Sequence, residues 1–212
     1  MLGEKIEISA GAPNLKLEIY KGHYATSHNH TSYYIDVAKN KSELAQAKAV
    51  AAKLAENYIN NCIVDTVLCI DGTEVIGACL AEELTSSHYA SMNAGRNINI
   101  LTPEYNAGNQ IFFRDNTVPM ITGKFVLVLA ASVDTGVTAK SAVGSVTYYG
   151  GRAVGIASIF ATIDECDGIP VTSIFDMQDL PGYATYAPNE CPMCKKGEKL
   201  NALVNSHGCS ML

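Results

Sequence analysis

Hydrophobic and polar residues follow two different periods along this chain. Two segments place apolar residues at the spacing of a helix face: 40–59 and 75–84. Four short apolar runs predict buried strands: 63–70, 125–129, 153–163 and 171–176. Strands that alternate with helices favour an α/β fold, in which helices cover both faces of a parallel sheet.

Local signals define some of the element boundaries. Asn40 and Glu43 have the spacing of a capping box at the start of the first helix. A further helix is expected from about residue 138 to 149, and Gly150-Gly151 would end it. Two shorter strands are expected on either side of a turn, at 98–101 and 110–114.

Composition and charge narrow the classes of function. The chain has 212 residues, which suits one medium-sized domain, and its net charge is −6 without any basic block. We therefore expect no nucleic-acid partner. The N-terminus lacks the pattern of a signal peptide, and the apolar runs are too short to span a bilayer, so no membrane partner is expected. Seven cysteines without a secretory signal indicate reduced thiols and a cytoplasmic protein.

The stretch "VLVLAASVDTGVTAKSAV" carries the main chemical signal. An apolar run ends, Asp134-Thr135-Gly136 form a loop, and a helix follows. Aspartic proteases use Asp-Thr-Gly, but they pair two such loops in an all-β structure, which the alternation of strands and helices disfavours. The alternative is an anion site, because a glycine loop before a helix N-terminus presents N–H groups to a phosphate.

Three segments of the sequence resemble the type I phosphoribosyltransferases, and orotate phosphoribosyltransferases most of all. "GKFVLVLAASVDTGVTAKSAVGSVTYYGGRAVGIASIFAT" (123–162) is similar to the signature strand, loop, helix and following strand of that family. "KGHYATSHNHTSYYID" (21–36) resembles the hood segment of orotate transferases, and "APNECPMCKKG" (187–197) resembles the Cys-Pro-x-Cys tail of one branch.

The resemblance implies a parallel sheet flanked by helices, with a small N-terminal hood. It divides the chain into a hood segment at 1–40, a phosphoribosyltransferase-like core at 41–180 and a tail at 181–212. The implied ligands are phosphoribosyl pyrophosphate with Mg²⁺ and a nucleobase or nucleotide, and the implied assembly is a homodimer.

The resemblance also assigns roles to two loops. The loop that would bind the 5′-phosphate comprises Asp134, Thr135, Gly136, Val137 and Thr138. The loop that would bind pyrophosphate comprises Asp71, Gly72, Thr73 and Glu74. Asp71 and Glu74 would hold Mg²⁺ through water, as hard oxygen ligands do.

The sequence departs from the family pattern at two places. Ala130 and Ala131 stand where paired acids normally contact the ribose hydroxyls. The mobile loop lacks the usual lysine and histidine, and Arg114 is the remaining cation there. Asp134 and Arg114 are thus the candidate catalytic residues, with Asp134 either an acid/base group or simply a helix cap. The alternative function is a sensor that binds phosphoribosyl pyrophosphate or a nucleotide with weak or no turnover.

The tail offers a candidate zinc site. Cys191, Cys194, His207 and Cys209 form a Cys₃His set at plausible spacing. The alternative is that the Cys-Pro-x-Cys thiols are structural and bind no metal. The histidines at 23, 28 and 30 are interpreted as polar contacts to a ligand or as part of a solvated loop.

Overall fold

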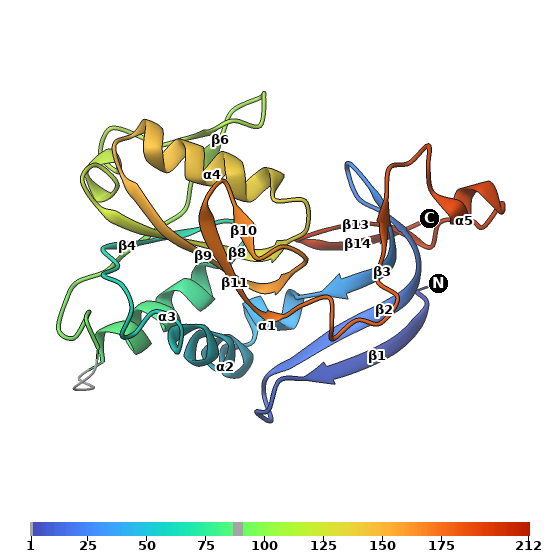
Figure 1. The fold of residues 1–212 in the computed structure, drawn as a ribbon, viewed down its shortest axis with the longest axis horizontal. Helices are drawn as coiled ribbons and strands as arrows, with labels where there is room; N and C mark the ends of the chain where they lie inside the picture. Colours follow the sequence, from blue (N-terminus) through green and yellow to red (C-terminus); the bar gives the residue numbers. More distant parts are fainter. Residues whose placement is uncertain (1, 87–90) are drawn as a thin grey trace.

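The computed structural model describes residues 2–86 and 91–212. Two sheets dominate it, and they lie side by side along the long axis of the molecule (Figure 1). Their strands are collected from distant parts of the sequence, so both ends of the chain meet in one sheet while the middle forms the other.

The core sheet has the strand order β10-β11-β9-β8-β4-β5. Its strands are β4 Thr66–Cys69, β5 Asn99–Leu101, β8 Phe125–Val133, β9 Arg152–Ala161, β10 Glu165–Cys166 and β11 Ile169–Phe175. The neighbours β11–β9, β9–β8, β8–β4 and β4–β5 are parallel, and the edge strand β10 is antiparallel to β11. The predicted α/β parallel sheet is therefore confirmed.

Helices cover both faces of the core sheet (Figure 1). These are α2 Leu44–Ala55 and α3 Glu74–Thr85 on one face, and α4 Val137–Tyr148 on the other. Alternate residues of β8 explain this arrangement: Leu127 and Leu129 pack with α2 and α3, whereas Val126 and Val128 pack with α4. A strand buried on both faces reads as a continuous apolar run, which is the pattern seen in the sequence.

The first helical segment differs from its prediction. It is broken into α1 Ala38–Ser42 and α2, because Glu43 between them has extended backbone angles. The predicted capping box is wrong: Asn40 lies inside α1 and is buried, and its side-chain amide donates to the carbonyl of Lys16 at 2.8 Å. A tertiary contact to the hood has displaced the local capping interaction.

The second sheet joins the hood segment to the tail. Its strands are β1 Glu4–Ser9, β2 Lys16–Ala25, β3 His30–Asp36, β12 Thr185–Tyr186, β13 Ala202–Asn205 and β14 Gly208–Met211. β2 pairs with β3 along its length, with β1 at one end and with β13 at the other. The tail thereby extends the hood sheet, with the short helix α5 Pro192–Lys195 lying between β12 and β13.

The remaining elements are small. A hairpin is formed by β6 Glu104–Tyr105 and β7 Ile111–Phe112, and a 3-10 turn spans Val118–Met120. Within the two described ranges, no helix has the length and apolarity needed to cross a membrane.

Candidate active site

The loop between β8 and α4 has the geometry expected of an anion cradle. The strand runs to Val133, the loop comprises three residues, and α4 begins at Val137, one residue earlier than predicted. Gly136 is the N-cap residue with a φ of 74°, and no side chain caps the helix. The first-turn N–H groups of α4 therefore have no capping side chain, and such groups suit a phosphate.

Asp134 does not cap α4, so the alternative that it serves only as a helix cap is wrong. Its carboxylate instead accepts hydrogen bonds from Thr162, at 3.4 Å, and from Tyr183. Thr162 also donates to the Asp134 carbonyl at 2.7 Å. Burial raises the pKa of Asp134 above its ordinary value, and the two hydroxyl donors oppose this shift. A carboxyl with a raised pKa suits proton transfer nearer neutral pH.

The residues of the second predicted loop have different surroundings: Asp71 lines the cleft, whereas Thr73 is buried in the core. Asp71 has a φ of 60°, in the left-handed region, and lines the cleft. Thr73 is fully buried, and its hydroxyl donates to the carbonyls of Ile70 and Leu129 at 2.8 and 3.0 Å. Glu74 accepts a hydrogen bond from Thr102 at 3.3 Å. Of the two predicted Mg²⁺ ligands, Asp71 alone lines the cleft, as a hard oxygen donor that suits a water-mediated ion.

A buried lysine connects this loop to the tail. The Lys41 ammonium donates to the carbonyls of Asp71 and Ser206, both at 2.6 Å. Ser206 also donates to the Asp71 carboxylate at 3.3 Å, and the N–H of Ala131 donates to the same carboxylate. Burial raises the pKa of Asp71 and lowers the pKa of Lys41. Hydrogen bonds thus link the Asp71 loop to β8 and to the tail.

These segments enclose a cleft of about 260 Å³ between the core and the hood. Its walls include all of the predicted 5′-phosphate loop, Asp71, Tyr183, hood residues from the β2–β3 region, and residues 204–206 of the tail. Parallel α/β sheets bind ligands beyond the carboxyl ends of their strands, and this cleft lies at that edge of β8.

Comparisons with known proteins agree with this geometry. No family model matches the sequence. The orotate phosphoribosyltransferase of Caldanaerobacter subterraneus subsp. tengcongensis is 28% identical over 190 residues, which cover 86% of this chain and 88% of that protein.

Two crystal structures share the fold. A phosphoribosyltransferase from Corynebacterium diphtheriae aligns with a TM-score of 0.53 and 19% identity, over 74% of this chain and 89% of its own. The orotate phosphoribosyltransferase of Mycobacterium tuberculosis H37Rv in complex with 5-phospho-α-D-ribosyl 1-diphosphate aligns with a TM-score of 0.50 and 19% identity, over 69% and 83% of the two chains. This chain has the type I phosphoribosyltransferase fold. The resemblance drawn from the sequence is confirmed, and an aspartic protease is excluded because the Asp-Thr-Gly loop joins a parallel strand to a helix.

The signature strand of this phosphoribosyltransferase fold is packed as a core strand. Ala130 and Ala131 are buried on opposite faces of the sheet, 1% and 0% exposed. Ala130 lies directly opposite Ser158 of β9, whose buried hydroxyl has no hydrogen-bond partner in the part of the chain that the structure describes. The positions that would carry paired acids therefore offer no side-chain group to a ribose.

Arg114 follows the β6–β7 hairpin and is fully engaged there. Its Nε and Nη2 donate to the two carboxylate oxygens of Glu104 at 2.8 and 2.7 Å, and its guanidinium lies 5.0 Å from the ring centre of Phe112. Its side chain is 64% exposed, and it is not part of the cleft wall. The structure does not bring Arg114 and Asp134, the two predicted catalytic residues, together at the cleft.

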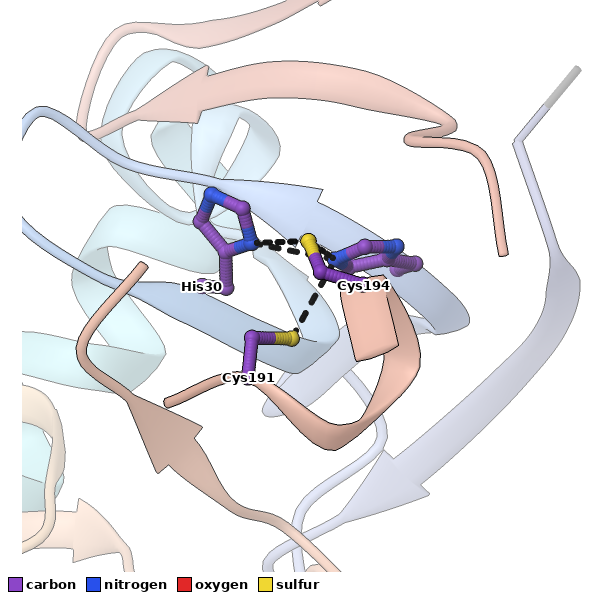
Figure 2. Close-up of side chains that lie close together, drawn as sticks. His30, Cys191 and Cys194 are labelled. Carbon is purple, nitrogen blue, oxygen red and sulfur yellow. Dashed lines mark hydrogen bonds between the residues drawn. The ribbon is translucent and has the colours of Figure 1, made fainter. Parts of the chain in front are cut away.

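The predicted zinc ligands are only partly brought together. Cys191 and Cys194 lie against His23 and His30 of the hood (Figure 2). His207 and Cys209 lie on the β13–β14 hairpin, outside this group. Two of the histidines interpreted as polar or solvated thus belong to a Cys₂His₂ cluster, which sequence spacing does not reveal because the two pairs are about 160 positions apart.

Sequence reasoning also missed Lys41, Tyr183 and Ser206. Lys41 reads as one more polar residue at a helix start, and Tyr183 and Ser206 lie in a tail without an obvious motif. No local pattern marks Lys41, because a lysine is rarely buried and its two acceptor carbonyls come from distant segments.

Proposed function

We propose that this protein binds phosphoribosyl pyrophosphate, or a nucleoside monophosphate, in the cleft between core and hood, and transfers the phosphoribosyl group to a nucleobase as orotate phosphoribosyltransferases do. The observation that supports this most is the cradle at residues 134–138. It combines a left-handed glycine, an uncapped helix N-terminus and a position on the cleft wall. In the reaction the bond from the sugar carbon to pyrophosphate breaks, and a bond to a base nitrogen forms.

The residues of the chain would divide the work as follows. The N–H groups of the cradle would bind the 5′-phosphate, and the hydroxyls of Thr135 and Thr138 would add donors. Asp71 would face the pyrophosphate end, where Mg²⁺ supplies charge neutralisation when it is bound. Asp134 would accept the proton that the base nitrogen loses when it bonds to the sugar carbon, because its pKa is raised and it lines the cleft.

A second candidate is a binding protein with little or no turnover. It is favoured by the burial of Ala130 and Ala131 and by the pairing of Arg114 with Glu104. Without the paired acids, two hydrogen bonds to the ribose of about 1.5–3 kcal/mol each are lost. With Arg114 paired to Glu104 away from the cleft, the leaving pyrophosphate lacks the charge stabilisation of that cation.

Two measurements separate these candidates. Calorimetry with phosphoribosyl pyrophosphate and Mg²⁺ tests the cradle, and pyrophosphate release with orotate, uracil, adenine and hypoxanthine tests turnover. We expect binding, and turnover with orotate. Binding without pyrophosphate release in the presence of any of the four bases would establish the second candidate, and absence of binding to both phosphoribosyl pyrophosphate and nucleoside monophosphates would refute both.

Arg114→Ala tests the remaining cation. If Arg114 leaves Glu104 to stabilise pyrophosphate, its loss should lower kcat with little change in Kd. Arg152→Ala is the matched control, because that guanidinium also lies over a ring, 5.9 Å from the centre of Phe125. The homodimer and the cytoplasmic location belong to the same proposal, and sedimentation equilibrium tests the dimer.

A further inference from the structure

Four potential metal ligands converge where the tail packs on the hood. His23 is on β2, His30 begins β3, Cys191 is the N-cap of α5 and Cys194 lies within α5. Their ligand atoms all lie within 4.8 Å of one another. Figure 2 shows the thiols of Cys191 and Cys194 and the ring of His30 converging on a common space.

The separations match those of ligands around one tetrahedral ion. Zn–N bonds of about 2.0–2.1 Å and Zn–S bonds of about 2.3 Å imply about 3.3 Å between two nitrogens and about 3.6 Å between nitrogen and sulfur. Here His23 Nε2 lies 3.1 Å from His30 Nδ1, and it lies 3.4 and 3.6 Å from the sulfurs of Cys191 and Cys194. Cys194 Sγ lies 3.3 Å from His30 Nδ1. These four separations agree with the tetrahedral values to within about 0.3 Å.

The surroundings of His23 orient it as a ligand. Its other ring nitrogen, Nδ1, lies 3.0 Å from the carbonyl of Glu198, and the ring is almost fully buried. A proton on Nδ1 donated to that carbonyl leaves Nε2 with a free lone pair aimed at the cluster. Metal-bound histidines are typically held in this way.

We propose that His23, His30, Cys191 and Cys194 bind a structural zinc ion. Four protein ligands close the coordination sphere, which is typical of structural rather than catalytic sites. The cluster is formed by side chains from both ends of the chain, so the ion cross-links the hood to the tail.

The cross-link also bears on the cleft. Just beyond α5, Asn201 is clamped to His23: its side-chain oxygen accepts from the His23 N–H at 2.8 Å, and its own N–H donates to the His23 carbonyl at 2.7 Å. β13 begins at the next residue and leads to Ser206, which contacts Asp71 and Lys41. Loss of the ion is therefore expected to loosen the tail wall of the cleft.

The test uses the full chain, purified under reducing conditions. We expect about one equivalent of zinc by elemental analysis, and Co²⁺ added to the chelator-treated protein should give the intense charge-transfer absorption of thiolate ligands. Cys194→Ser should abolish that absorption, and it is the variant of choice because Cys194 is exposed whereas Cys191 is buried. Cys209→Ser is the matched control, an exposed cysteine outside the cluster, and should retain one equivalent of metal.

A thermal shift provides the second readout. Chelator should lower the Tm of the wild-type protein and of Cys209→Ser, and should leave the Tm of Cys194→Ser unchanged. The proposal is overturned if the reduced wild-type protein takes up neither zinc nor Co²⁺, or if bound Co²⁺ shows no thiolate absorption. Metal uptake kept in Cys194→Ser would also overturn it, and loss of uptake in both Cys194→Ser and Cys209→Ser would overturn it in favour of the Cys₃His alternative.

Discussion

Gly136 offers the sharpest test of the cradle. Replacement by alanine adds a single methyl group at a residue whose φ is 74°. The new carbon would lie 3.0 Å from Ile163 Cδ1 and 3.3 Å from Cys166 Sγ. It therefore points toward those two residues, so the variant would perturb the cradle by shifting its backbone. This steric reason for the glycine is additional to the N–H groups that the glycine loop is predicted to present to a phosphate.

The magnitude follows from two contributions. A left-handed conformation costs an L-residue about 1–2 kcal/mol relative to glycine. The two tight contacts add about 1 kcal/mol or more, because Ile163 and Cys166 must move by a few tenths of an ångström. Gly150→Ala is a matched control at the other end of α4, where φ is 78° and the new carbon meets only Thr122 at 3.6 Å. It carries the conformational cost without the steric one.

Urea unfolding and calorimetry measure the two consequences. We expect Gly136→Ala to lose about 2–3 kcal/mol of stability and Gly150→Ala about 1–2 kcal/mol. A shift of the cradle that removes one N–H hydrogen bond to a phosphate would weaken binding by about 1.5–3 kcal/mol, or roughly tenfold to a hundredfold in Kd. Gly150→Ala should bind phosphoribosyl pyrophosphate like the wild-type protein.

An unchanged Kd in folded Gly136→Ala would refute the assignment of residues 134–138 as the phosphate site. Equal losses of affinity in both variants would show that the effect comes from general destabilisation, and the cradle would again lose its support.

Three further perturbations test the architecture around the site. Two lysine partners lower the pKa of Glu18 to about 2, so the stability that this carboxylate gives to the fold is complete above about pH 4.5 and is lost as the pH falls toward 2. Glu18→Gln should remove about 1 kcal/mol of that acid dependence after solvent screening, measured by urea unfolding across this pH range. Lys41→Met should cost about 3 kcal/mol because it leaves two buried carbonyls without their donor, whereas the same change at an exposed lysine of α2 should have little effect. Ala131→Asp places a second carboxylate beside Asp71 and should lower the free energy of unfolding by more than about 3 kcal/mol. Ala130→Asp should cost less, because its carboxylate can accept a hydrogen bond from the Ser158 hydroxyl. Equal free energies of unfolding for the two variants would contradict this reasoning.

The parallel strands of the core sheet were predictable from sequence because each carries its own signal, whereas the two-residue edge strand β10 was not predicted. The apolar run of β8 and the helical spacing of α3 depend on local patterns and on burial on both faces of the sheet. The break between α1 and α2 was not predictable, because it depends on Asn40 reaching a carbonyl of the hood, 24 positions earlier. Helix propensity predicts that the segment is helical, whereas a tertiary contact determines where its helices begin and end.

The same distinction applies to the candidate site. The cradle is one continuous segment, so strand, glycine and helix could be read in order, and all of its residues reach the cleft. The rest of the cleft wall includes Tyr183 and Ser206, which have no sequence pattern that relates them to the cradle. The proposed zinc ligands were predictable only in part. The Cys-x-x-Cys pair is a local signal, whereas the other two ligands were predicted downstream and lie in the hood.

The part of the site that follows the family pattern depends on backbone geometry, and the parts that depart from it depend on side chains. A phosphate cradle depends on backbone geometry, so one left-handed glycine before a helix preserves it even when the neighbouring side chains change. Ribose recognition and leaving-group stabilisation depend on individual side chains. The side chains of Ala130 and Ala131 carry no polar group, and Arg114 is paired with Glu104 outside the cleft. The hydrogen bonds from Lys41 to the carbonyls of Asp71 and Ser206 hold the Asp71 loop and the tail together beside this cradle. The proposed affinity for a phosphorylated ribose therefore rests on the backbone geometry of residues 134–138, and not on the side chains that differ from the family pattern.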